Sequence, residues 1–176
     1  MIAAGQKVQI HLDLTIDHLK DYKTQYILAT LPGMSDEQDF IMVHSDAMFQ
    51  GAMDNASGMA TGIDIARHYS AMPKEKRPRT MVFFVDPDHH NTERGRDIMA
   101  ASYDWSKVAF ILNLEHTSQA QLFLMNNDLE IGDAVNARRW FVSGSPEFQQ
   151  LVKHQFKDFG VSVYTTPESN AGGSLG

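Results

Sequence analysis

Apolar residues along this chain recur with two periods, one typical of strands and the other typical of helices. Apolar and polar side chains alternate over residues 7–14, which predicts a half-buried strand. Short apolar runs that end at turn residues fit strands covered by the rest of the fold. On this basis we predict further strands at residues 26–31, 40–43, 80–85, 108–114, 121–125 and 161–164.

Three segments show helical spacing of their apolar residues. The first begins at Ala56 and stops before Pro73, and the second covers residues 94–103. The third begins at Ser145, a good N-cap that is followed by a proline and a glutamate, and it stops at Gly160. Helices interleaved with buried strands predict an α/β fold built on a layered sheet.

Length and charge narrow the class of protein. A chain of 176 residues fits a single domain, and we expect it to be cut from a longer protein because it starts within a strand-like pattern and stops after a loop. The net charge of -7 argues against nucleic acid as a partner. The basic residues between 74 and 79 are predicted to lie in a solvated loop. No apolar run reaches the length of a membrane span, and the sequence does not fix the oligomeric state.

Polar side chains gather where three of the predicted strands end. His44-Ser45-Asp46 follows the strand at 40–43, residues 86–90 follow the strand at 80–85, and Glu115-His116 follows the strand at 108–114. Reactive residues in α/β sheets gather at the carboxyl ends of the strands. Because the chain has no cysteine, any metal must be held by His, Asp and Glu, which suits zinc or another divalent ion.

The spacing of His44 and Asp46 has a physical logic. Residues two apart in an extended segment point the same way, so Asp46 can accept the free N–H of the His44 ring and leave the other nitrogen for a metal. The alternative is that His44-Ser45-Asp46 lies in a solvated loop and binds no metal. Asp54 is a further candidate ligand, and its alternative role is an Asx turn or an N-cap for the helix that begins at Ala56.

Taken together, these residues resemble the di-zinc aminopeptidase family, which includes secreted bacterial leucyl aminopeptidases and, more distantly, glutamate carboxypeptidases and glutaminyl cyclases. The resemblance is carried by His44-Ser45-Asp46 and by residues 51–58, Gly-Ala-Met-Asp-Asn-Ala-Ser-Gly, and it extends from Tyr26 to Glu115. It implies a three-layer α-β-α sandwich around a mostly parallel mixed sheet. It also slightly favours a secreted or periplasmic location.

The resemblance also implies a role for each matched residue. His44 and Glu115 would bind one zinc ion, Asp54 would bridge it to a second, and Asp46 would orient His44. Glu115 stands where the family has an aspartate, a change between two hard oxygen donors. The implied activity is hydrolysis of peptide or amide bonds, with a peptide or aminoacyl compound as the substrate.

Two departures from the family pattern bear on this activity. The family has two adjacent glutamates, a general base and a ligand of the second metal, and counting back from Gly95 places these roles on His89 and His90. Counting forward from Phe83-Phe84 places them near Pro87 and Asp88 instead, so Asp88 is the alternative base. The family also supplies a late histidine to the second metal, and no residue matches it here. A catalytically silent relative that keeps one metal for stability or binding is therefore the competing hypothesis.

Overall fold

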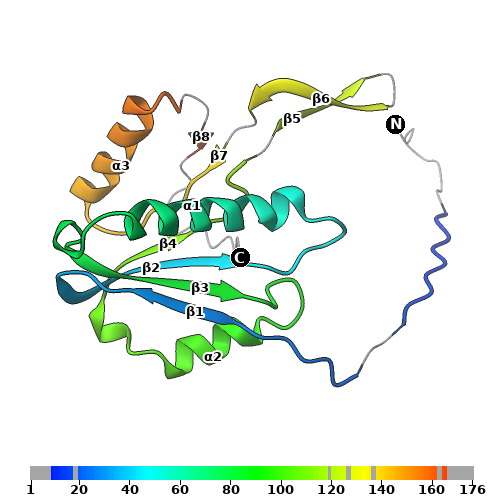
Figure 1. Cartoon of the computed structure of the whole chain (residues 1–176). Coiled ribbons are helices and arrows are strands. Elements are labelled where there is room, and N and C mark those ends of the chain that lie inside the picture. The colour runs from blue at the N-terminus through cyan, green and yellow to red at the C-terminus, as the bar shows by residue number, and fades with distance from the viewer. Residues whose placement is uncertain are drawn as a thin grey trace.

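The computed structural model describes residues 9–17, 20–118, 120–125, 128–135, 138–161 and 164–165. Its main sheet has four strands in the order β1-β3-β2-β4 (Figure 1). The strands are β1 (Ile27–Leu31), β2 (Ser35–His44), β3 (Arg79–Asp86) and β4 (Val108–Asn113). β2 pairs in parallel with both β3 and β4, whereas β1 is antiparallel to β3. The predicted strands at 26–31, 40–43, 80–85 and 108–114 are thereby confirmed.

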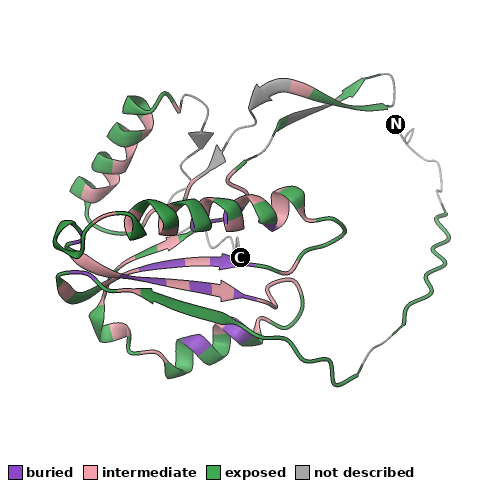
Figure 2. Ribbon diagram, in the orientation of Figure 1, coloured by how far each residue is buried: buried purple, intermediate pink, exposed green. Residues whose placement is uncertain are grey.

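Helices cover the two faces of this sheet. Successive residues of a strand point to opposite faces, so β2 presents Phe40 to one side and Ile41 to the other. Phe40 packs with Met99 of α2 (Arg94–Ser102), whereas Ile41 belongs to the cluster that contacts α1 (Gly58–Ser70). Figure 1 shows α1 and α2 on opposite sides of the strands, and Figure 2 shows the buried residues concentrated on β2 and β3. The expected three layers and the α/β class are confirmed.

The remaining elements extend the fold beyond the four strands. β5 (Ala120–Met125) and β6 (Asp128–Val135) form an antiparallel pair, and β7 (Arg138–Arg139) pairs with β8 (Tyr164–Thr165). The helix α3 (Pro146–Asp158) begins as predicted, because the Ser145 side chain accepts the N–H of Phe148. The ring of Phe148 lies 5.9 Å from that of Phe110, which packs α3 against β4. Short helical turns cover Lys74–Lys76 and Trp105–Lys107, and the segment Ala52–Ser57 is interrupted by non-helical backbone at Asp54 and Asn55.

The predicted strand at residues 7–14 is wrong over its described part. Residues 9–14 belong to no helix or strand, and the side chains that should have been covered are exposed, Ile10 by 88% and Leu12 by 80%. An alternating pattern favours a strand only when a neighbouring strand takes up its backbone N–H and C=O groups. No such partner pairs with these residues in the part of the chain that is described. In the predicted strand 161–164, Val161 belongs to no strand, Tyr164 lies in β8, and residues 162–163 are not described.

The basic segment between residues 74 and 79 is not simply a solvated loop. Arg77 is buried, and its guanidinium donates to the backbone oxygens of Pro32 (3.1 Å), Tyr69 (3.0 Å) and Met72. A planar guanidinium has several N–H donors in fixed directions, so one side chain can satisfy several free carbonyls. Arg77 thus ties the end of α1 to the loop between β1 and β2. No helix among the described residues is long and apolar enough to cross a membrane.

Candidate metal centre

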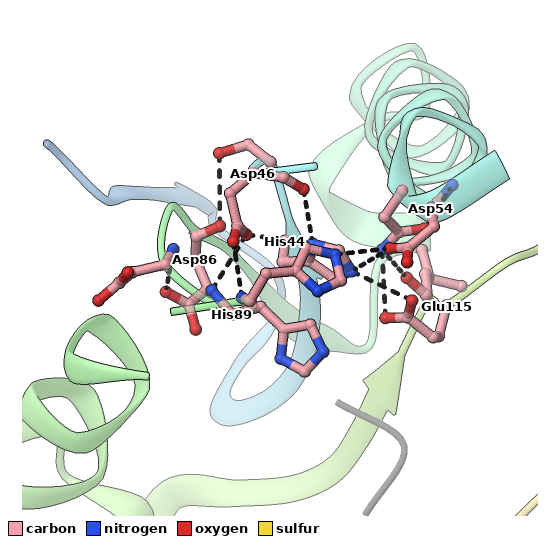
Figure 3. Close-up of polar contacts among 12 residues, drawn as sticks. His44, Asp46, Asp54, Asp86, His89 and Glu115 are labelled. Atoms are coloured by element: carbon pink, nitrogen blue, oxygen red, sulfur yellow. Dashed lines mark hydrogen bonds and ion pairs between the residues drawn. The ribbon is translucent and has the colours of Figure 1, made fainter. Parts of the chain in front are cut away.

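The carboxyl ends of the parallel strands meet at one edge of the sheet and bring the predicted site residues together. His44 is the last residue of β2 and pairs with Asp86, the last residue of β3. The N–H of Leu114 donates to Met42 at 2.9 Å, so Glu115 leaves β4 at the same edge. Asp54 comes from the segment Ala52–Ser57 before α1; its backbone is not helical there, and its peptide bond to Asn55 is cis. Figure 3 shows His44, Asp54 and Glu115 pointing toward one another.

The ring nitrogen Nε2 of His44 lies at the centre of this group. It is 3.2 Å from Asp54 Oδ1 and 3.1 Å from Glu115 Oε1. The structure therefore places the three residues of the predicted first metal site in direct contact through His44. His90 Nε2 lies 3.1 Å from the same oxygen of Asp54, so His90 joins the group as well.

The other nitrogen of His44 faces Asp46. Nδ1 lies 3.2 Å from Asp46 Oδ1 and 3.0 Å from the Asp46 carbonyl oxygen, so both acceptors favour a proton on Nδ1 and leave Nε2 free to bind a metal. Burial alone would lower the pKa of His44, but the hydrogen bond and charge of Glu115 and the contacts with Asp46 outweigh it and raise the pKa. The geometry is the one expected of a histidine ligand and the carboxylate that orients it.

Asp46 also holds the segment that carries the two adjacent histidines. Its Oδ1 accepts the N–H of His89 at 3.0 Å, and its Oδ2 accepts the N–H of His90 at 2.7 Å. Burial would raise the pKa of Asp46, but these two backbone donors and the neighbouring His44 and His90 lower it below its ordinary value. A single carboxylate thus fixes the orientation of His44 and the position of residues 89–90.

The two candidate bases have different surroundings. The Asp88 carboxylate accepts the Thr92 hydroxyl and lies 3.4 Å from the N–H groups of Thr92 and of Arg94 at the start of α2. These contacts, the Thr92 hydroxyl foremost, lower the pKa of Asp88. The His89 ring lies instead beside the His44 ring and tilted against it, with centroids 4.5 Å apart (Figure 3). Asp88 therefore serves the local backbone, whereas His89 faces the site.

Asn55 is buried next to the site and forms hydrogen bonds with the segments that carry the candidate ligands. It is only 1% exposed, and its Oδ1 accepts the N–H groups of Gly58 at 3.0 Å and His116 at 3.3 Å. Its Nδ2 donates to Leu114 O at 2.8 Å and lies 3.4 Å from Glu115 Oε2. The capping role that was the alternative for Asp54 thus falls to Asn55, which leaves the carboxylate of Asp54 to face the histidines.

His116 approaches the site although the sequence pattern did not select it as a ligand. Its Nε2 lies 3.0 Å from Glu115 Oε1 and 3.4 Å from Asp54 Oδ2. The signal that could have found it is its position directly after a candidate ligand. Strand alternation argues against two adjacent ligands, because neighbouring residues of an extended chain point to opposite sides.

The donors fit a divalent metal ion. Among the described residues, two sets of three donor atoms lie within 4.8 Å of one another, one from His44, Asp54 and His90 and the other from Asp54, Glu115 and His116. Imidazole nitrogen and carboxylate oxygen are zinc ligands, and the mixture of both suits zinc better than calcium or magnesium. Partial burial would raise the pKa of Asp54, but its hydrogen bond to His90 and the nearby rings of His90 and His116 lower it, which favours the ionised form that a metal needs.

The comparison with known protein families agrees with this chemistry. Searches among curated proteins and among solved structures found no match. The sequence profile of Peptidase family M28 matches residues 26–175, so the likeness continues through the segment after Glu115, where the motif resemblance fades. This family hydrolyses peptides with the help of bound metal. The edge of the sheet carries histidine and carboxylate donors that suit the metal of such an enzyme. Because the match spans nearly the whole chain, the chain belongs to Peptidase family M28.

Proposed function

We propose that this chain is a zinc-dependent aminopeptidase, which removes residues from the amino terminus of peptides. Metal-dependent peptide hydrolysis belongs to the family; the zinc ion and the preference for a free amino terminus are the proposal. The observation that carries it is the position of Asp54 Oδ1, which lies 3.2 Å from His44 Nε2 and 3.1 Å from His90 Nε2. Three donors from three separate segments of the chain converge there, as the ligands of a metal ion do.

Different residues of the site would bind the metal and position its ligands. His44, Asp54, His90 and Glu115 would hold the metal, which when bound polarises the scissile carbonyl and lowers the pKa of a bound water. Asp46 positions His44 through Nδ1 and positions residues 89–90 through their backbone N–H groups. The site is reachable, because the Asp54 side chain is 30% exposed.

His89 is the proposed general base. Imidazole accepts a proton near neutral pH, and the His89 ring stands next to the rings of His44 and His90, at centroid distances of 4.5 and 5.0 Å. It would take a proton from the attacking water and pass it to the departing amine. Asp88 is the weaker candidate, because its carboxylate already accepts hydrogen bonds from Thr92 and its pKa is lowered.

The preference for a free amino terminus is proposed from the family resemblance. The carboxylates of Asp54 and Glu115 do not add to this argument, because both would be metal ligands whose charge a bound cation neutralises.

The experiment is an assay of the zinc-loaded chain on leucyl and alanyl anilides, before and after treatment with a chelator. The proposal expects turnover that is lost with the chelator and restored by zinc. A chain that binds zinc but releases no amine from either anilide or from a peptide mixture would contradict it, and it would support the silent, metal-binding relative.

The base is tested by a pair of variants. His89→Ala should lower kcat by two to four orders of magnitude, the usual contribution of a positioned acid–base group, with little effect on stability. Asp88→Ala should instead leave kcat within about threefold and cost about 0.5–2 kcal/mol of stability, because it removes a cap at the start of α2. The reverse outcome would assign the base to Asp88.

A further inference from the structure

We infer that His116 is a metal ligand. It would complete a second set of donors, in which the family uses a late histidine that has no match in this sequence. This inference rests on the proposed function, because it adds a ligand to the same centre. It assigns His44, Asp54 and His90 to one ion and Asp54, Glu115 and His116 to a second ion. Glu115 thereby moves from the ion that the family resemblance implied it shares with His44 to the second ion.

The first support is the state of the His116 ring. Its Nε2 is fully covered by neighbouring atoms and makes no hydrogen bond with correct geometry, although Glu115 Oε1 lies only 3.0 Å away. A buried nitrogen without a partner costs about 1–3 kcal/mol. A metal ion placed between these donors removes that cost, because it accepts the lone pairs of the nitrogen and the carboxylates together.

The second support is the orientation of the Asp54 carboxylate. Its Oδ1 faces His44 and His90, at 3.2 and 3.1 Å, whereas its Oδ2 faces His116 at 3.4 Å. The two oxygens of one carboxylate therefore address two different sets of donors, as expected of a bridging ligand. Each set contains three protein donors, the number typical of a catalytic zinc site that keeps an open position.

The third support is the backbone at the end of β4. Adjacent residues of a strand point to opposite faces, so Glu115 and His116 could not both reach Asp54 from an extended chain. Residue 116 has a φ of 46°, in the left-handed region, and its N–H lies 3.3 Å from Asn55 Oδ1. This turn, held by a buried asparagine, brings two neighbouring side chains to the same point.

The test measures how many zinc ions the metal-free chain binds, by isothermal titration and by metal analysis after desalting. Asparagine and glycine both tolerate a left-handed backbone, so His116→Asn and His116→Gly remove the ring without straining the turn. His154→Asn is the matched control, because the His154 side chain is 69% exposed on α3. Far-ultraviolet circular dichroism of the metal-free proteins checks that both His116 variants fold.

We expect two zinc ions per chain in the wild type and in His154→Asn. Both His116 variants should keep one tight ion and bind the other at least tenfold more weakly, since even the loss of a group behind a ligand costs ten- to a hundredfold in affinity. Two ions of unchanged affinity in the His116 variants would overturn the inference and leave the proposed function standing. A wild-type chain that binds no zinc would overturn both.

Discussion

Asn55 donates a hydrogen bond of 2.8 Å from its buried amide to the carbonyl oxygen of Leu114. This contact joins the segment that precedes α1 to the end of β4. Each partner stands next to a candidate ligand, since Asp54 precedes Asn55 and Glu115 follows Leu114. One hydrogen bond therefore sets the spacing of two carboxylates that come from distant parts of the chain.

Replacing Asn55 with alanine should damage both stability and metal binding. The change leaves the Leu114 carbonyl and the Gly58 N–H without this partner in a buried place, which costs about 1–3 kcal/mol. It also frees Glu115, so we expect zinc affinity to fall at least tenfold. Urea unfolding and zinc titration measure the two effects. Asn91→Ala, at an exposed position, is the control, and an Asn55→Ala chain that matches it in both assays would refute the role of Asn55.

Two glycines of α1 should respond differently to alanine. A Cβ on Gly58 would lie 2.3 Å from Asn55 Oδ1 and 2.4 Å from Leu114 O, so Gly58→Ala must push apart the contact that spaces the ligands. We expect a loss of about 1–3 kcal/mol, as for other overpacked sites. A Cβ on Gly62 would lie 3.4 Å from Val43, an ordinary contact, so Gly62→Ala should be neutral or stabilise α1 by up to about 1 kcal/mol. Equal thermal stabilities of the two variants would be inconsistent with this packing.

Asp86 should make stability depend on pH. It is 4% exposed, and burial, helped by the charges of Asp46 and Asp88, raises its pKa above the ordinary 3.8. Because the folded chain holds this proton more tightly than the unfolded chain, the stabilising effect is complete below the ordinary pKa and is lost as the pH rises through the folded pKa. Asp86→Asn should therefore match the wild type near pH 3.8 and exceed its stability at pH 7.

The measurement is urea unfolding of the metal-free chain from pH 4 to pH 8, with exposed Asp64→Asn as the control. In Asp86→Asn, the new amide oxygen can still accept the Asp88 N–H, which Asp86 Oδ1 accepts at 3.2 Å in the wild type. A stability gain that does not grow with pH would show that burial does not disfavour the charge of Asp86.

The sequence was sufficient for the four strands of the main sheet and for the placement of His44, Asp46 and Glu115 at its edge. The strands could be predicted because short apolar runs between turn residues are typical of strands buried on both faces. The site residues could be placed because parallel strands have their carboxyl ends at the same edge of a sheet. Sequence periodicity led to a wrong prediction where the segment has no neighbouring strand to pair with in the described part of the chain. The alternation at residues 7–14 found no strand to pair with, whereas β6, which was not predicted, pairs with β5 although Leu129 and Ile131 remain exposed.

His116 and Arg77 show a second limit. The orientation of His116 depends on a left-handed residue at the end of β4, and residue types do not reveal that turn unless a glycine or asparagine marks it. Arg77 lies in a run of basic residues, and its burial depends on three free carbonyls from two other segments, the end of α1 and the loop between β1 and β2. Both features are set by tertiary contacts that no local pattern records.

We propose that Asp54 joins His44, His90 and the end of β4 in one metal centre. The most direct test is zinc titration of metal-free Asp54→Ala beside the wild type, followed by thermal unfolding at saturating zinc. We expect the wild type to bind zinc and to gain about 2.7 kcal/mol of stability when free zinc is a hundredfold above its Kd, and we expect Asp54→Ala to lose both the binding and the gain. Zinc binding of unchanged stoichiometry and affinity in Asp54→Ala would show that Asp54 is not a ligand.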